Sequence, residues 1–120
     1  MTRPGTQAVD RAAMRQTIDG EATLLEQFVE LLRREQASLT QGVADDLPQL
    51  ADQKNGLVIQ LNQLSAQRAL FLEARGLTAD RAGIDAWCAQ GQDPEASSTW
   101  QKVLQLATEA QELNRVNGEL

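Results

Sequence analysis

The sequence predicts an all-α protein: an elongated, coiled-coil-like antiparallel helical hairpin, followed by a short third helix and a C-terminal helix packed on the hairpin. Between residues 47 and 75, apolar side chains recur on alternating steps of three and four, the spacing of one helix face; they are Leu47, Leu50, Leu57, Leu61, Leu64 and Phe71. Leu and Ala dominate the hydrophobic residues, and the chain has only two Trp, two Phe and no Tyr. This composition favours helices over strands.

The first helix is expected at residues 7–41, with Thr6 as its cap. Between residues 11 and 20 its large apolar side chains thin to Met14 and Ile18, so we expect this half to be loosely packed. From residue 21 onward apolar residues cover a wide face of this helix.

The second helix is expected at residues 45–75. Gly42 is placed to end the first helix, and either Asp45 or Asp46 then caps the second one ahead of Pro48. Because the connection is short, the two helices should be antiparallel neighbours. A helix of this length is about 40 Å long, which predicts an elongated molecule.

Two features interrupt the seam of the second helix. Gly56 belongs to an Asn-Gly pair that is typical of turns, but the apolar repeat continues through it, so we expect a local weakness within one helix. Lys54 and Arg68 fall on the apolar seam. They either pair with carboxylates of the first helix, such as Glu35 and Glu21, or pack their stems on the stripe while their charges reach water. We favour the second interpretation.

The rest of the chain predicts a short helix at residues 78–90, capped by Thr78, and a final helix at residues 95–120. The single cysteine, Cys88, lies beside Trp87 in the short helix. We interpret Cys88 as a small half-buried hydrophobe, because a cysteine nucleophile would need a histidine partner and the chain has none.

Charge and composition narrow the function. A net charge of -6 works against binding to nucleic acid and to anionic lipids. The absence of His removes histidine-based triads and the usual metalloprotease motif. We therefore expect no enzymatic activity, no metal site and no cofactor. The sequence shows neither a signal peptide nor an apolar segment of about 20 residues, so we expect a cytoplasmic protein without membrane insertion.

Three blocks of the sequence together are characteristic of one protein family. The first is the run LLRREQASL at residues 31–39, followed by Gly42. The second is an apolar repeat interrupted by a lysine, formed by Leu47, Leu50, Lys54, Leu57 and Leu61. The third and most distinctive is LNRVNGEL at residues 113–120. In this combination the chain resembles the FlgN family of flagellar export chaperones, from about Glu21 to its last residue.

The resemblance implies one helical chaperone domain over residues 1–120 that works in type III flagellar export. It would hold hook/filament junction proteins by their amphipathic C-terminal helices, prevent premature assembly and interact with the flagellar export apparatus. The alternative is a structural coiled-coil adaptor or a self-assembling homodimer without a secreted client, which would use the same apolar seam.

The client-binding surface is expected on the final helix, whose apolar stripe is wider than one partner hairpin needs; the candidate residues are Trp100, Leu104, Leu113, Asn114, Val116, Asn117 and Leu120. Asn114 and Asn117 are included because their amides would be poorly satisfied in a dry core. Core packing remains the alternative interpretation for the apolar members of this set.

Overall fold

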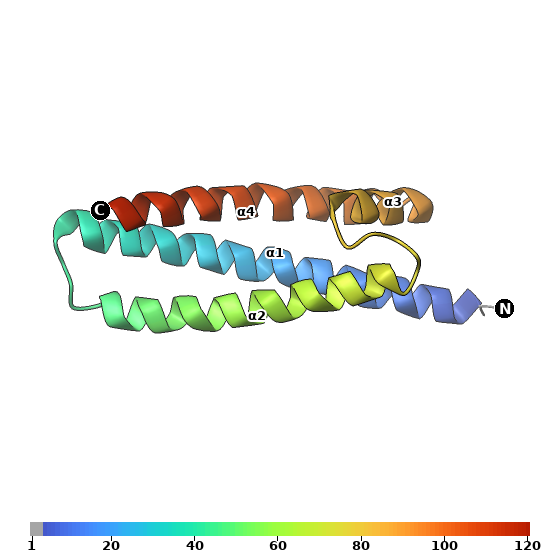
Figure 1. Ribbon diagram of the computed structural model, residues 1–120, viewed down its shortest axis with the longest axis horizontal. Helices are drawn as coiled ribbons and strands as arrows, with labels where there is room; N and C mark the ends of the chain where they lie inside the picture. Colours follow the sequence, from blue (N-terminus) through green and yellow to red (C-terminus); the bar gives the residue numbers. More distant parts are fainter. Residues whose placement is uncertain (1–3) are drawn as a thin grey trace.

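A computed structural model describes residues 4–120, with side chains from residue 11 onward. It contains four helices in this range: α1 (Pro4–Gln41), α2 (Leu47–Glu73), α3 (Arg81–Gly91) and α4 (Pro94–Glu119). The molecule measures 61 × 20 × 20 Å. α1 lies between α2 and α4, α2 runs antiparallel to α1, and α4 runs parallel to it (Figure 1). The predicted fold class is therefore confirmed.

The α1–α2 connection forms largely as predicted. Gly42 adopts a φ of +69°, the left-handed conformation that ends many helices. Asp46 occupies the N-cap position of α2, with Pro48 as the second helical residue. The prediction of a side-chain cap is wrong, however, because the Asp46 carboxylate instead accepts hydrogen bonds from the Ser38 hydroxyl at 2.9 and 3.0 Å. This contact ties the beginning of α2 to the end of α1.

The other helix boundaries differ from the predictions by a few residues. α1 begins at Pro4, before the predicted cap Thr6, whose side chain lies outside the described residues. α2 ends at Glu73, ahead of a turn through Gly76, which has a φ of +73°. α4 begins at Pro94, one residue earlier than expected.

The cap of α3 is Asp80 and not Thr78. The Asp80 carboxylate accepts a hydrogen bond from the Gly83 amide at 3.0 Å, and the Thr78 hydroxyl donates to the same carboxylate. The Thr78 carbonyl also packs so closely on the helix that a Cβ at position 83 would lie 1.7 Å from it. The turn therefore requires glycine at that position.

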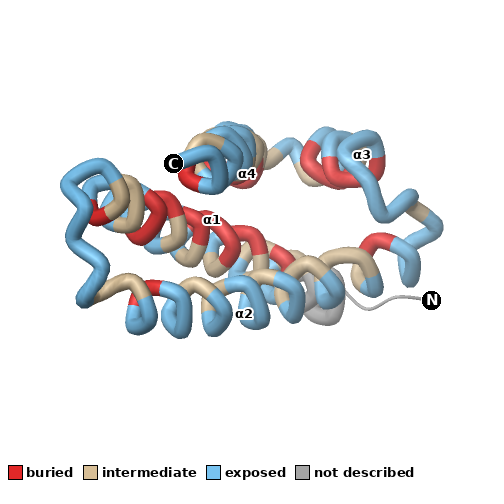
Figure 2. Tube along the Cα trace, turned by 60° about the vertical axis from the view of Figure 1, so that its left-hand side comes forward, coloured by how far each residue is buried: buried red, intermediate tan, exposed pale blue. Residues whose placement is uncertain are grey.

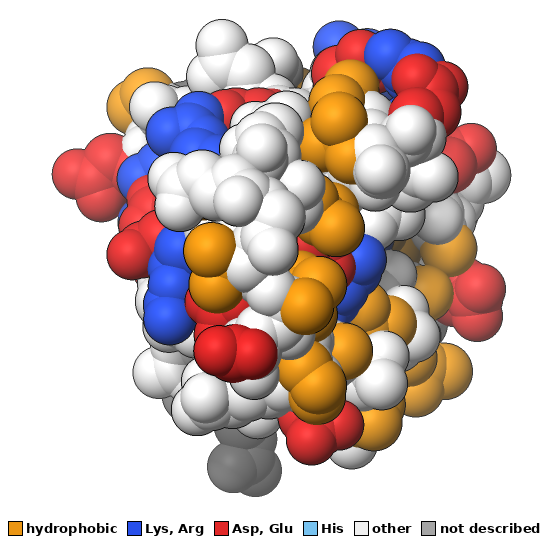
Figure 3. All heavy atoms as spheres, turned by 90° about the vertical axis from the view of Figure 1, so that its left-hand side faces the viewer, with side chains coloured by type: hydrophobic (Ala, Val, Ile, Leu, Met, Phe, Trp, Pro, Cys, Tyr) orange, Lys and Arg blue, Asp and Glu red, His pale blue; other side chains and the backbone are white. Residues whose placement is uncertain are grey.

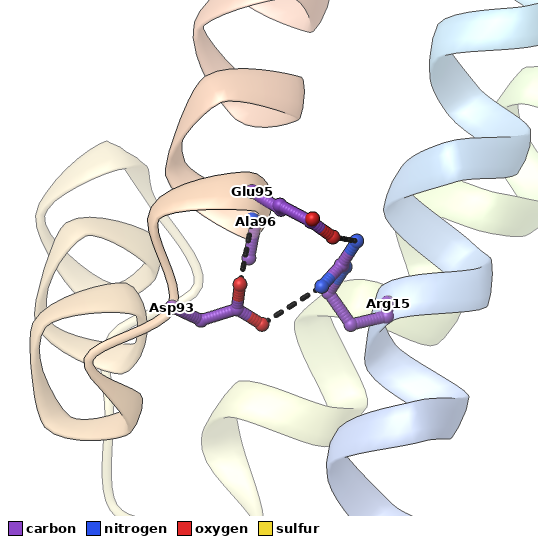
Figure 4. Close-up of polar contacts among 4 residues, drawn as sticks. All are labelled: Arg15, Asp93, Glu95 and Ala96. Atoms are coloured by element: carbon purple, nitrogen blue, oxygen red, sulfur yellow. Dashed lines mark hydrogen bonds and ion pairs between the residues drawn. The ribbon is translucent and has the colours of Figure 1, made fainter.

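An ion pair fixes the beginning of α4 against α1 (Figure 4). Asp93 caps α4 by accepting a hydrogen bond from the Ala96 amide at 3.1 Å, while its other carboxylate oxygen lies 2.8 Å from Arg15 Nη1. Glu95 also approaches this guanidinium, at 3.5 Å. The hydrogen bond from the Ala96 amide and, to a smaller extent, the guanidinium of Arg15 hold the pKa of Asp93 below its ordinary value.

The hydrophobic core has two parts. The main cluster joins all four helices, and its buried members are Met14, Ile18, Ala22, Leu25, Leu72, Ile84, Trp87, Cys88, Ala96, Trp100 and Val103. The second cluster lies between α1 and α4 and contains Val29, Leu32 and Ala110. The first half of α1 was expected to be loosely packed, yet Met14 and Ile18 are among the most buried residues. That expectation is wrong because α3 and α4 cover this half.

Gly56 lies inside α2, which continues through it as one helix. A Cβ added at this position would meet no atom within 4 Å. Gly56→Ala should therefore raise the free energy of unfolding by up to about 1 kcal/mol, because alanine restricts the unfolded chain and favours the helix. Urea denaturation measures this change, and a clear loss of stability would mean that the helix is broken at this position.

Candidate protein-binding surface

The inner face of α4, the predicted binding element, is covered by α1. Trp100 is buried in the main cluster, and the guanidinium carbon of Arg68 lies 5.0 Å from the centre of its ring. Leu104 is half-buried and packs against the same cluster. A partner protein therefore does not reach Trp100 as long as α4 remains seated on α1.

Asn117 is also buried, with only 6% of its surface exposed. Its amide nitrogen donates to the backbone carbonyl of Leu32 and to the carboxylate of Glu35, both at 2.9 Å. Lys54 Nζ lies 3.5 Å from the same oxygen of Glu35. This arrangement connects α1, α2 and α4 through one carboxylate. The amide nitrogen of Asn117 is thus satisfied inside the protein, contrary to the reasoning from sequence, whereas its buried carbonyl oxygen has no hydrogen-bond partner among the described residues.

The other predicted residues remain accessible near the end of α4. Leu113 and Val116 are half-buried, whereas Asn114 and Leu120 are exposed. The three aliphatic side chains lie at positions i, i+3 and i+7, which places them on one side of the helix. Seen from this end of the molecule, hydrophobic side chains form a broken band among charged groups (Figure 3).

An open groove along α4 brings two of the predicted residues together. Leu104 and Leu113 both line it, with Leu106 between them. Its other lining residues are all polar and include charges of both signs; they are Arg33, Arg81, Gln101, Lys102, Gln105, Thr108, Glu109 and Glu112. Apolar side chains beside mixed charges suit the two faces of an amphipathic helix. We call this region the α4 groove.

Leu106 was missed as a candidate in the sequence analysis. It is half-buried and contacts both core clusters, as well as lining the α4 groove. The available signal was its separation of seven residues from Leu113, which places both side chains on one helix face.

The charged residues around the end of α4 are paired. Arg33 pairs with Glu109, and Arg115 lies 2.6 Å from Glu112 and 2.8 Å from Glu119. The guanidinium of Arg115 holds the pKa of Glu112 below its ordinary value. These pairs are exposed, so they shape the local charge pattern more than they stabilise the fold.

Cys88 is buried in the main cluster together with Trp87, in agreement with its interpretation as a hydrophobe. Burial raises the pKa of its thiol, which disfavours the reactive thiolate. Among the described residues, no group of three or more potential ligands is placed to hold a metal ion. Nor is any helix in the described range long and apolar enough to span a membrane.

A family model described as FlgN protein matches residues 10–120. The chain belongs to the FlgN family. FlgN proteins are flagellar export chaperones for hook-associated proteins and have no enzymatic activity. The resemblance found in the sequence is thereby confirmed, together with the general function that it implied. No curated protein and no solved structure matched the chain significantly.

Proposed function

We propose that this FlgN chain acts in the cytoplasm, where it binds the amphipathic C-terminal helix of a hook-associated subunit in the α4 groove. The observation that supports this proposal most directly is the groove itself. Leu104, Leu106 and Leu113 provide its apolar part, and charges of both signs surround them. Val116 and Leu120 extend the apolar surface to the end of the chain.

The proposed binding mode explains how a chaperone can hold and later release its client. An amphipathic helix lays its apolar face into the groove, while its polar face remains in water. Because a free terminal segment is disordered, its ordering opposes part of the binding free energy. The complex is therefore stable enough to prevent premature assembly and weak enough to be opened at the export apparatus.

Within this proposal, the seven candidate residues have two roles. Leu104, Leu113, Val116 and Leu120 contact apolar client side chains, and Asn114 offers hydrogen bonds at the margin of the surface. Trp100 and Asn117 position α4 against α1 from below the surface, since both are buried.

The alternative function is a structural coiled-coil adaptor without a secreted client. Native mass spectrometry with and without the C-terminal peptide of a hook-associated subunit distinguishes the two functions. A 1:1 complex with the peptide supports the chaperone. If the mass of the protein is the same with and without the peptide, while its helices are intact, the adaptor is supported.

The proposal predicts the effect of removing apolar area from the end of α4. The double variant Leu113→Ser/Val116→Ser should bind the client peptide at least about tenfold more weakly, a loss of about 1.4 kcal/mol that partial removal of two aliphatic contacts accounts for. Isothermal titration calorimetry measures the affinity, and circular dichroism reports whether the helices remain.

Two further variants make this test selective. Leu120→Ser removes an exposed side chain that belongs to neither core cluster, so it should weaken binding without changing the melting temperature. Gln111→Ser changes an exposed polar residue of the same helix and should leave both quantities unchanged. Unaltered client affinity in Leu113→Ser/Val116→Ser and in Leu120→Ser, with the fold intact, would contradict the proposed location.

A further inference from the structure

The outer side of α2 is an exposed surface without a partner in the described chain. Only Leu50 and Leu72 of this 27-residue helix are buried, and most of α2 is exposed or intermediate (Figure 2). On the side that faces away from α1, Ile59 and Leu70 expose 59% and 67% of their surfaces. Gln63 and Ala66 lie between them at helical spacing and are also exposed. We call Ile59, Gln63, Ala66 and Leu70 the α2 outer face.

This face is free of charge over a long distance. Between Asp52 and Glu73 the sequence contains only two charged residues, Lys54 and Arg68. Both turn toward α1, where Lys54 Nζ lies 3.5 Å from a Glu35 oxygen and Arg68 Nη1 lies 3.2 Å from a Glu21 oxygen. The outer side of α2 therefore carries no charged side chain between Asp52 and Glu73, a length of about 20 residues or about 30 Å. It contrasts with a chain that is 23% charged.

The lack of charge indicates what kind of partner the face fits. Exposed aliphatic groups without charged neighbours are typical of the centre of a protein–protein interface. A strongly charged partner would find no counter-charge on this face. Two copies of the chain, each with a net charge of -6, repel one another, and their repulsion is smallest where charged side chains are absent.

The spacing of the face is also compatible with a twofold axis. From Ile59 through Gln63 and Ala66 to Leu70, the steps are four, three and four, the same in both directions. When two such helices cross antiparallel, Ile59 of one copy therefore meets Leu70 of the other, and Gln63 meets Ala66. Such self-complementarity is the requirement for an isologous dimer.

We propose that a second copy of this chain binds the α2 outer face, with the two α2 helices antiparallel. One helix face of this length covers a few hundred Å² on each copy, below the ~800 Å² per partner of a standard stable interface. The dimer should therefore be weak and form only at high protein concentration. It leaves α4 exposed, and the proposal does not depend on the client.

The first test is the oligomeric state of the whole chain. Sedimentation velocity from about 10 μM to about 1 mM should show a shift from monomer to dimer. Raising the salt concentration to roughly 0.5 M should strengthen the dimer, because salt screens the repulsion between the two acidic chains. A chain that remains monomeric throughout this range overturns the proposal.

Variants locate the interface. Ile59→Glu/Leu70→Glu should remain monomeric at every concentration while keeping its helicity, because both positions are exposed. Gln101→Glu/Gln105→Glu adds the same charge to exposed positions of α4 and should, at high salt, dimerise like the parent. A dimer that persists in the α2 variant overturns the proposal. The proposal is also overturned if the parent is monomeric and Ile59→Glu/Leu70→Glu no longer binds the client, because the α2 outer face would then be a client-binding surface.

Cross-linking tests the orientation. Ile59→Cys mixed with Leu70→Cys should form a disulfide-linked heterodimer at least about tenfold faster than either variant alone, because a disulfide needs Cα atoms about 4.4–6.8 Å apart. The native Cys88 is buried and does not compete. Gln105→Cys on α4 controls for random collisions. Equal cross-linking in the mixture and in each single variant overturns the antiparallel arrangement.

Discussion

Replacing Trp87 with alanine is expected to lower the free energy of unfolding by about 3–5 kcal/mol, the usual cost of removing a large buried aromatic side chain. Trp87 has 1% of its surface exposed and is the largest fully buried side chain. Its ring makes an edge-on contact with Phe71, with centres 6.1 Å apart, and the guanidinium carbon of Arg11 lies 4.2 Å from its centre. One side chain thus joins α3 to α1 and α2.

The effect is large relative to the total stability of a domain, which is typically about 5–15 kcal/mol. Guanidinium chloride denaturation followed by circular dichroism gives the change, and Trp100 provides a second, fluorescent probe. Gln90→Ala alters an exposed residue of the same helix and should change stability by less than about 0.5 kcal/mol. Trp87→Ala with the stability of Gln90→Ala would show that α3 does not anchor the core.

Part of this core was readable from the sequence and part was not. The apolar repeat of α2 correctly indicated a helix packed along a hairpin, although Val58, which widens that stripe in the sequence, remains exposed. The sparse segment around Met14 and Ile18 was misjudged, because local hydrophobicity does not reveal which distant residues pack there. Trp87 and Trp100 from α3 and α4 supply the missing volume.

The two cations on the α2 seam were also misjudged. Lys54 and Arg68 pair with Glu35 and Glu21, although solvated charges were favoured. The register of the hairpin was the missing information, and the sequence held a clue to it. In an antiparallel pair of helices, the numbers of facing residues add up to a constant value. The residue numbers of the Lys54–Glu35 pair and those of the Arg68–Glu21 pair add up to the same value, as one common register requires.

The positions of the candidate client-binding residues in the fold were also foreseen only in part. Amphipathic spacing selected Leu104 and Leu113, and both line the α4 groove. It placed Asn117 on the surface, because a buried amide needs partners that the sequence of α4 alone does not show. Those partners are on α1, where a helix carbonyl and the Glu35 carboxylate both accept from the amide. Whether a polar residue is buried between helices therefore cannot be told from the sequence of its own helix; the partners on the neighbouring helix must be known.

The Arg68–Glu21 pair predicts the second large effect, the loss of stability in Arg68→Met. The Glu21 carboxylate is buried between the helices; one oxygen lies 3.2 Å from Arg68 Nη1, and the other has no hydrogen-bond partner among the described residues. Removing the cation leaves this carboxylate buried and unpaired, which costs about 3–5 kcal/mol. The methionine side chain retains most of the apolar stem, so the loss reports mainly on charge.

The pH dependence identifies Glu21 as the cause. Desolvation, only partly opposed by Arg68, raises the pKa of Glu21 to about 6 from an ordinary value of 4.5. The folded state therefore binds more protons than the unfolded state between these values. The contribution of Glu21 to stability is largest below about pH 4.5 and decreases as the pH rises through 6, by about 2 kcal/mol in all. Arg68→Met should raise the pKa of Glu21 further. The loss of stability on raising the pH should therefore be larger in this variant than in the parent.

Urea denaturation from about pH 4.5 to about pH 8 compares the parent, Glu21→Gln, Arg68→Met and the double variant. In Glu21→Gln, stability should no longer fall with rising pH on account of residue 21, because glutamine does not titrate. At about pH 8 the double variant should be more stable than Arg68→Met, because no unpaired carboxylate remains. Asp93 and Glu112, whose pKa values lie below their ordinary values, are common to all four chains and cancel in the comparison. Parallel pH profiles for the parent and Glu21→Gln would exclude Glu21 as the titrating group.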